Sequence, residues 1–153
     1  MRREFPPLRL KPDLLSAYNN LATIYFLAGD APHALNVIMQ GLQVGETPLL
    51  KSMFVNYLRH APSIPDSDAL RQYVVRALSE PWGRPGAIAT ACLTLVKCDP
   101  RIKHSIDRAA AAWPHRLSCE DLFGAEGLPA AASDPLLRAM LQSAYVPDVP
   151  LER

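Results

Sequence analysis

The sequence predicts an all-α fold in which one helical hairpin is followed by a stacked, right-handed array of further helices. Apolar residues recur at helical spacing along most of the chain. Several of its 15 prolines directly follow a residue that caps helices, as in Thr47-Pro48, Asp99-Pro100 and Asp134-Pro135. Proline at the first helical position, after a Thr or Asp cap, is a helix start signal. No stretch alternates apolar and polar residues over a useful length, so we expect no sheet.

Composition limits the classes of protein to which the chain can belong. Its 153 residues suit one domain, and a hydrophobic content of 49% is enough to bury a core. The formal net charge is +1, from 16 basic and 15 acidic residues, so charge favours neither a nucleic acid nor an anionic membrane as a partner. No apolar run approaches the roughly 20 residues that a membrane helix needs. The basic start Met1-Arg2-Arg3 precedes no apolar segment, which argues against a secretory signal.

Cysteine usage predicts a reducing compartment. The chain has three cysteines, Cys92, Cys98 and Cys119, and no CxxC motif. An odd and sparse set of this kind is typical of reduced thiols, so we expect a cytoplasmic protein. Cys92 lies between Ala91 and Leu93 and is expected to be a small core residue.

Residues 12–47 predict the hairpin. Asp13 can cap its first helix and Gly29 can end it, while Asp30 can cap the second helix and Gly45 can end it. The very short connection makes the two helices antiparallel neighbours. The apolar stripes at helical spacing are Ala17, Tyr18, Leu21, Ile24, Tyr25 and Ala28 in the first helix, and Ala34, Leu35, Ile38 and Leu42 in the second.

The same stretch resembles a tetratricopeptide repeat. Its first helix carries the pattern Tyr18-x2-Leu21-Ala22-x2-Tyr25, and its second carries Ala34-x3-Ile38. The family places Trp, Leu, Gly and Tyr on the first helix and Ala and Phe on the second, so each position holds a residue of the same kind. The resemblance implies antiparallel helices that touch at small residues, with large residues filling the space between them. Gly41, where Ala is usual, and Glu46, where the closing Pro stands, depart from the pattern.

Residues 1–11 are expected to be the worn end of an earlier repeat. The segment Leu8-Arg9-Leu10-Lys11-Pro12-Asp13 resembles the junction between two such units. Because Phe5-Pro6-Pro7 breaks any helix before it, we expect most of this N-terminal segment to be extended or disordered.

Residues 48–153 predict a helical extension of the hairpin. The expected helices span residues 48–59, 70–78, 86–97, 100–112 and 134–145. A capping box, Ser118-x-x-Asp121, opens a short turn that ends at Gly124. The first two of these helices would stack as a second, degenerate pair, and residues 86–97 would be central because they are almost continuously apolar. The residues expected to face inward are Leu50, Met53, Phe54, Tyr57, Leu58, Leu70, Tyr73, Val74, Ala77, Leu78, Ile88, Ala89, Ala91, Cys92, Leu93, Leu95, Val96, Ile102, Ile106, Ala109, Ala110, Trp113, Leu136, Leu137, Met140, Leu141 and Ala144.

Four motifs of the second half are Leu78-Ser79-Glu80-Pro81-Trp82-Gly83-Arg84-Pro85, Ala109-Ala110-Ala111-Ala112-Trp113-Pro114-His115-Arg116-Leu117, Leu122-Phe123-Gly124 and Asp134-Pro135-Leu136-Leu137. Through these motifs, the chain resembles a helical region of large bacterial proteins over roughly residues 12–153. That region follows a tetratricopeptide array and precedes a class I methyltransferase domain that uses S-adenosylmethionine. Because no strand here leads into a Gly-rich turn, the resemblance implies a substrate-docking or linker region rather than the catalyst. We expect a continuation after Leu151-Glu152-Arg153.

The first helix carries the candidate binding residues. Asn19, Asn20, Thr23 and Phe26 lie at helical spacing on the face where such repeats hold peptides. In O-linked N-acetylglucosamine transferases, whose arrays are related, an asparagine at the place of Asn20 holds a peptide backbone, and an amide offers both a donor and an acceptor for this. The alternative is that Asn19 and Asn20 are solvated helix residues. Phe26 and Leu27 form either an exposed docking patch or a contact with a preceding repeat.

Other reactive or charged residues have structural interpretations. The four histidines have no Cys or His at metal spacing, and carboxylates next to Cys119 disfavour a thiolate nucleophile. We therefore expect no metal site and no catalytic residue. Trp82 and Trp113 are expected to pack in the core or at corners. The basic residues Arg84, Arg101, Lys103 and Arg108 could form a basic strip, but because Asp99 and Asp107 alternate with them we expect a solvated helix back instead.

These observations favour a non-catalytic, protein- or peptide-binding helical module that uses no cofactor. The alternative is an accessory fragment of a tetratricopeptide-containing, S-adenosylmethionine-dependent methyltransferase that docks its substrate. The expected partner is a protein or peptide rather than a nucleic acid or a membrane. An apolar helix face left open by a missing repeat would also favour a homodimer.

Overall fold

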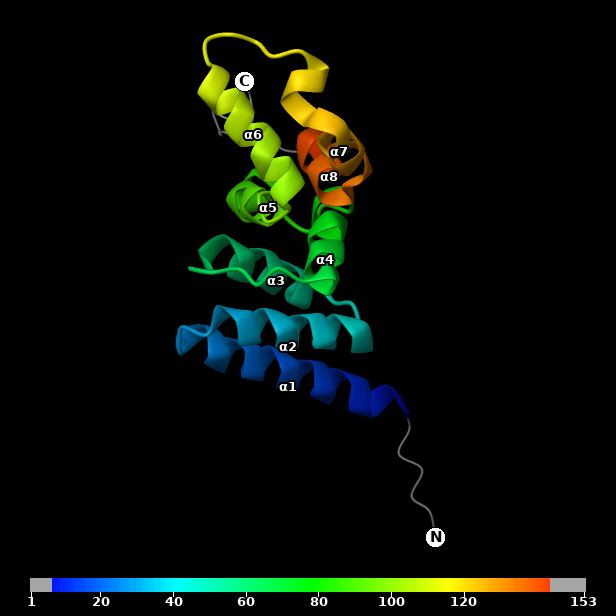
Figure 1. The fold of residues 1–153 in the computed structure, drawn as a ribbon. Coiled ribbons are helices and arrows are strands. Elements are labelled where there is room, and N and C mark those ends of the chain that lie inside the picture. Colours follow the sequence, from blue (N-terminus) through cyan, green and yellow to red (C-terminus); the bar gives the residue numbers. More distant parts are fainter. Residues whose placement is uncertain (1–6, 144–153) are drawn as a thin grey trace. The chain divides into compact units, whose positions relative to one another are not determined.

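The described part of the protein is all-helical, as the sequence predicts. In this computed structural model, residues 7–143 form eight α-helices and one 3-10 helix, and no strand occurs among them (Figure 1). The chain divides into two compact units, Met1–Pro65 and Asp66–Arg153. This division places the third helix with the hairpin, whereas we predicted a boundary after residue 47. The tetratricopeptide type of the hairpin and the right-handed stacking remain predictions.

The first unit contains α1 (Pro7–Leu27), α2 (Ala31–Val44) and α3 (Pro48–His60). Figure 1 shows α1 running beside α2, and α3 on the other side of α2. Gly29 has a φ of 83°, and the N–H of the next residue, Asp30, donates to the carbonyl of Tyr25 at 2.9 Å. This is the glycine-ended helix stop that the sequence predicts, and it turns the chain back within three residues.

Caps at the other helix starts of this unit are also confirmed. The N–H of His33 donates to Asp30 Oδ1 at 3.2 Å, and the N–H of Leu50 donates to Thr47 Oγ1 at 3.2 Å. Each bond satisfies one of the backbone donors that a helix start leaves open. The local pairs Asp30…His33 and Thr47…Leu50 therefore define where α2 and α3 begin.

The start of α1 differs from the prediction. The helix begins at Pro7 and continues through Pro12, whereas we expected a cap at Asp13 and extended backbone before it. A proline fits the first helical position because its φ is already helical and its missing N–H is not needed there. Pro7 therefore starts a helix instead of stopping one. Residues 1–6 lie outside the described part of the chain.

The core of the first unit lies along α2. The buried apolar residues predicted for this unit are Ala22, Ala34, Leu35, Ile38, Leu42, Leu50, Phe54, Tyr57 and Leu58. Close packing explains why position 41 is glycine and not the usual alanine. A Cβ at Gly41 would lie 3.1 Å from Tyr18 Cβ and 3.3 Å from Leu50 Cδ1. An alanine at this position would have to push both neighbours aside, so glycine lets α2 pack closely against α1 and α3.

Four of the six residues in the apolar stripe predicted for α1 are exposed. Tyr18 and Tyr25 are half-buried against the unit, but Ala17 and Ala28 are exposed. Leu21 and Ile24 are 43% and 62% exposed. Among the described residues of this unit, α2 and α3 therefore cover only one side of the stripe.

The second unit begins with α4 and ends with α8. Within it α4 and α5 contact α8, and α6 contacts α7. Four predicted or newly found caps start its helices, namely Ser67, Asp99, Ser118 and Asp134. The elements are α4 (Asp68–Ser79), η1 (Pro85–Ile88), α5 (Ala89–Val96), α6 (Pro100–Ala112), α7 (Cys119–Ser133) and α8 (Pro135–Ser143).

Two elements of the second unit differ from the prediction. Residues 86–97 were expected to be one helix, but the 3-10 turn η1 precedes α5. The turn opened by Ser118 was expected to end at Gly124. Gly124 does leave the helical conformation, with a φ of 63°, but the helix resumes after it and runs to Ser133. The pair of helices that we expected to stack as a second repeat falls into different units, so that pairing remains a prediction.

Burial in the second unit follows the predicted pattern with exceptions on α6 and α8. Leu95, Val96 and Met140 are fully buried, but Leu141 is 61% exposed and Trp113 is 58% exposed, although both were expected to face inward. Ala144, Tyr145 and the predicted extended tail lie outside the described residues. Within residues 7–143, none of the helices combines the length and the apolar content needed to span a bilayer.

A tight contact between α6 and α7 yields a stability prediction. A Cβ at Gly127 would lie 2.8 Å from Ser105 Oγ and 3.3 Å from Phe123 Cβ. We expect Gly127→Ala to lower the free energy of unfolding by about 1–2 kcal/mol, because this overpacking outweighs the gain in helix propensity. Adding Ser105→Ala removes the nearest atom and should restore most of the loss, which denaturant unfolding of the four chains would measure.

Gly86 supplies the matched control for this prediction. A Cβ at Gly86 would meet nothing within 4 Å, so Gly86→Ala should change the free energy of unfolding by less than about 1 kcal/mol. Strictly additive effects of Gly127→Ala and Ser105→Ala would show that the two positions do not compete for space.

Candidate functional site

Two of the four residues predicted to bind a peptide, Thr23 and Phe26, contact a side chain of α3, and Asn19 precedes Thr23 by one helical turn. Thr23 Oγ1 donates to the carbonyl of Asn19 at 2.9 Å and lies 3.2 Å from the hydroxyl of Tyr57. The ring of Phe26 stacks on the ring of Tyr57, with centroids 4.2 Å apart and planes at 11°. Tyr57 was predicted only as a core residue, and it is buried. Thr23 and Phe26 therefore already have a partner within the first unit.

Asn20 lies on a different face of α1. Consecutive helix residues are about 100° apart, so Asn20 turns away from Asn19 and is exposed. Its neighbours at helical spacing are apolar and exposed: Ile24 at 62% and Leu27 at 81%, with Leu21 at 43% beside them. We call Asn20, Leu21, Ile24 and Leu27 the open face of α1. It offers one amide on an otherwise apolar surface.

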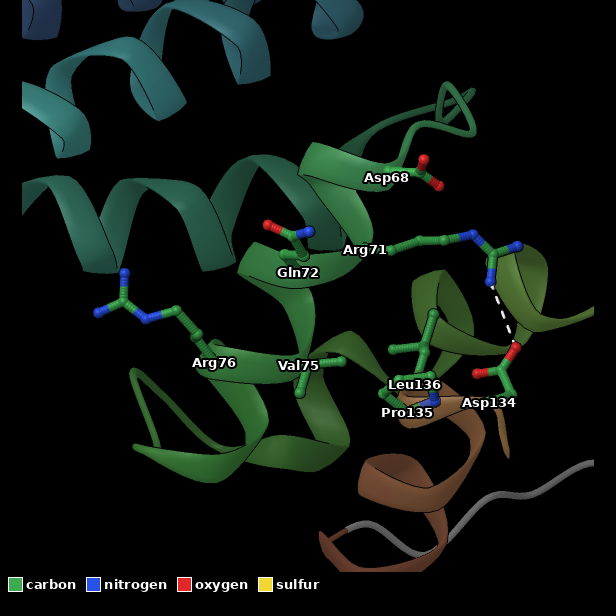
Figure 2. A pocket seen from close by; sticks show the side chains of 8 residues that line it. All are labelled: Asp68, Arg71, Gln72, Val75, Arg76, Asp134, Pro135 and Leu136. Atoms are coloured by element: carbon green, nitrogen blue, oxygen red, sulfur yellow. Dashed lines mark ion pairs between the residues drawn. The ribbon is translucent and has the colours of Figure 1, made fainter. Parts of the chain in front are cut away.

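A cluster of ion pairs joins α4 to the start of α8. Arg71 Nε lies 2.6 Å from Asp66 Oδ1, and Arg71 Nη1 lies 3.5 Å from Asp134 Oδ2. Arg71 Nη2 donates to the carbonyl of Leu95, in the last turn of α5. The hydrogen bond with Asp66 raises the pKa of Arg71 above its usual value. Figure 2 shows Arg71 reaching from α4 toward Asp134, while Arg76 points the other way.

A cavity of about 460 Å³ lies beside this cluster. Its cations already have acidic partners, because Arg71 pairs with Asp66 and Asp134, and Arg76 Nε lies 2.7 Å from Glu80 Oε2. An anion entering the cavity would have to compete with these carboxylates. The cluster is therefore best explained as a structural link within the second unit. Its lining residues are Asp68, Arg71, Gln72, Val75, Arg76, Asp134, Pro135 and Leu136 (Figure 2).

A second cavity, of about 430 Å³, lies among α6, α7 and α8, and we call it the α6–α8 cavity. Its most buried lining residues are Ile102, Ser105, Ile106 and Leu137. Its most exposed ones include Leu128, Arg138 and Leu141. No single stretch of sequence predicts it, since it depends on how three helices pack. The exposed Leu141, which we had expected in the core, is part of its rim.

Trp82, Arg101 and Lys103, which we interpreted structurally, are found in contacts of that kind, whereas Trp113 is exposed. Trp82 is half-buried, its ring centroid lies 6.2 Å from that of Tyr73, and the guanidinium of Arg76 lies 5.2 Å from it. Lys103 Nζ lies 2.7 Å from Asp107 Oδ2, and Arg101 Nη2 lies 2.9 Å from Asp99 Oδ2. These basic residues form ion pairs on the back of α6, as charge alternation along that helix predicts.

Comparisons with protein-family models, with curated proteins and with solved structures give no significant match to this chain. The resemblances drawn from motifs therefore remain predictions, and function has to be argued from the residues themselves.

Proposed function

We propose that the protein is a non-catalytic helical module that holds an extended peptide or a partner helix against α1. The observation that carries this proposal is the open face of α1, where three large apolar side chains are 43–81% exposed around Asn20. Contiguous exposed apolar surface of this kind marks interaction sites in many proteins. The apolar side chains would supply the buried area, and the Asn20 amide would pair with a peptide bond.

The neighbouring cluster of Asn19, Thr23, Phe26 and Tyr57 gives the proposed site a fixed edge. Because Phe26 and Thr23 are held by Tyr57, this side of α1 keeps one geometry. A ligand on the open face would therefore bind next to a preformed aromatic stack, which lowers the entropic cost of binding. The original assignment is thus revised: Asn20 contacts the ligand, whereas Thr23 and Phe26 shape the site.

The test uses a library of random peptides selected on the purified, full chain. For peptides that bind, Asn20→Ala should weaken affinity by about 3- to 10-fold, because it removes about one hydrogen bond. Leu27→Asp should weaken it further, since it puts a charge on the apolar contact. Both side chains are exposed, so the melting temperature should change little. Isothermal titration calorimetry and thermal unfolding would measure the two effects.

The matched control is Asn36→Ala, which removes the same kind of side chain from an exposed position on α2. Asn36 lies outside the open face, so affinity should be unchanged. Equal affinities for the parent chain, Asn20→Ala and Leu27→Asp would contradict the proposal. Light scattering tests for a second copy of the chain on the open face instead. In that case the molecular mass would rise with concentration for the parent chain but stay at the monomer value for Leu27→Asp.

An accessory role beside a methyltransferase domain rests on the motif resemblance alone. A Gly-rich methyltransferase motif in a reading frame that continues this chain would support it.

A further inference from the structure

The α6–α8 cavity differs in character from the open face of α1. Ile102, Ile106 and Leu137 lie at its base and are 3–8% exposed. Its volume of about 430 Å³ falls in the range of roughly 300–1,000 Å³ that is typical of small-molecule sites. A cavity of this volume can hold the body of one small apolar molecule.

The cavity offers almost no hydrogen bonds to the body of a ligand. Ser105 is the one polar residue at its base, and its hydroxyl already donates to the carbonyl of Arg101 at 3.1 Å. Apart from Arg138, the other described residues that line the cavity are apolar. A polar ligand body would lose its bonds to water there without replacing them, which is costly. The chemistry of the walls therefore selects a hydrocarbon.

Arg138 gives the rim a single positive charge. Among the described residues that line the cavity it is the one with a charge, and it is exposed. Among side chains of the described residues it has no ion pair and no hydrogen bond. The preceding acidic residue, Asp134, is engaged by Arg71 and by the N–H of Leu137. Among the described side chains, none therefore competes with an anion for the guanidinium of Arg138.

We infer that the α6–α8 cavity binds a free, single-chain amphiphile with an anionic head group, of the class of long-chain carboxylates. The hydrocarbon chain would lie against Ile102, Ile106 and Leu137, and the carboxylate would accept hydrogen bonds from the guanidinium of Arg138. Arginine suits this role because its planar donors match both oxygens of a carboxylate. This binding activity is independent of the proposed function of α1.

The test titrates the full chain with dodecanoate below its micelle concentration. We expect one binding site, and we expect Arg138→Gln to weaken dodecanoate about 10-fold, the loss typical of one charge-assisted hydrogen bond. Dodecan-1-ol, which has the same chain and no charge, should bind the parent chain and Arg138→Gln equally. Ala132→Trp, at an exposed lining position, should block both ligands by filling the cavity.

Arg116→Gln is the matched control, because Arg116 is an exposed arginine of the same unit that does not line the cavity. It should leave dodecanoate affinity unchanged, and circular dichroism should show that all variants keep their helices. No binding of dodecanoate, or equal affinity in the parent chain and in Arg138→Gln, would overturn the inference. Binding to phosphatidylglycerol vesicles without binding of dissolved dodecanoate would overturn it as well, in favour of a membrane surface.

Discussion

Replacing Arg71 by glutamine should lower the free energy of unfolding of the second unit by about 3 kcal/mol. Its guanidinium bonds to the carbonyl of Leu95 and pairs with Asp66 and Asp134. The side chains of Arg71 and Asp134 are only 20% and 10% exposed, so the substitution leaves a shielded carboxylate and a carbonyl without their cation. Denaturant unfolding followed by circular dichroism would measure the loss.

A double-mutant cycle separates the pair from the rest of the cluster. Asp134→Asn keeps an acceptor for the N–H of Leu137, which Asp134 Oδ1 binds at 2.8 Å, but removes the charge that faces Arg71. We expect the combination of Arg71→Gln and Asp134→Asn to cost less than the sum of the two, by about 1 kcal/mol. Arg101→Gln, which breaks an ion pair on the solvated back of α6, should cost less than about 1 kcal/mol. If Arg71→Gln lowered the free energy of unfolding by no more than Arg101→Gln does, the ion-pair cluster would not be what stabilises the second unit.

The second unit should also lose stability in alkali because of Cys92. Its side chain has no exposed surface, and burial raises the pKa of its thiol from 9.0 to about 12. Between these two pH values the unfolded chain releases the thiol proton and the folded chain keeps it. Ionisation of this thiol therefore leaves the free energy of unfolding unchanged below pH 9.0. It lowers that free energy progressively as the pH rises from 9.0 toward 12. At about pH 11 the loss should be ~3 kcal/mol.

Other groups titrate in the same pH range, so the measurement is a difference between two chains. Cys92→Ala removes the thiol and also leaves a small cavity, which costs about 1–2 kcal/mol at every pH. The gap in free energy of unfolding between the parent chain and Cys92→Ala should therefore shrink, and then reverse, as the pH rises from 8 to about 11. A gap that stays constant would show that the buried thiol ionises as easily as an exposed one.

The sequence predicts the elements of this fold well where the signal is local. The caps at Thr47, Ser118 and Asp134 depend on residues within three positions, and each is found where it was expected. The start of α1 was wrong because Pro7 has two local meanings: it ends a helix before it and begins one after it.

Exposure was harder to predict than helicity. An apolar stripe shows that a helix has a face suited to burial, but not whether another element covers it. Leu21 and Ile24 on α1 and Leu141 on α8 all fit their stripes, yet all are exposed. Each of them borders a surface for which we propose a ligand, so these mismatches between pattern and burial point to the candidate sites.

The candidate sites themselves depend on contacts between distant residues. Tyr57 meets Thr23 across 34 positions of sequence, and no periodic pattern specifies such a pair. The α6–α8 cavity requires three helices to pack with space between them. The asparagines of α1 could be identified from the sequence as candidates, but which of them is exposed depends on where α3 lies within the first unit.

The glycine break in α7 has a consequence for the shape of the α6–α8 cavity. At Gly124 the backbone leaves the helical conformation, and Arg108 Nη1 donates to the carbonyl of Leu122 at 3.1 Å just before the break. Leu122 and Leu128, which both line the cavity, therefore sit on segments with different axes. A straight helix would present one face to the α6–α8 cavity. Because α7 is kinked at Gly124, its two segments line this cavity with two differently oriented faces.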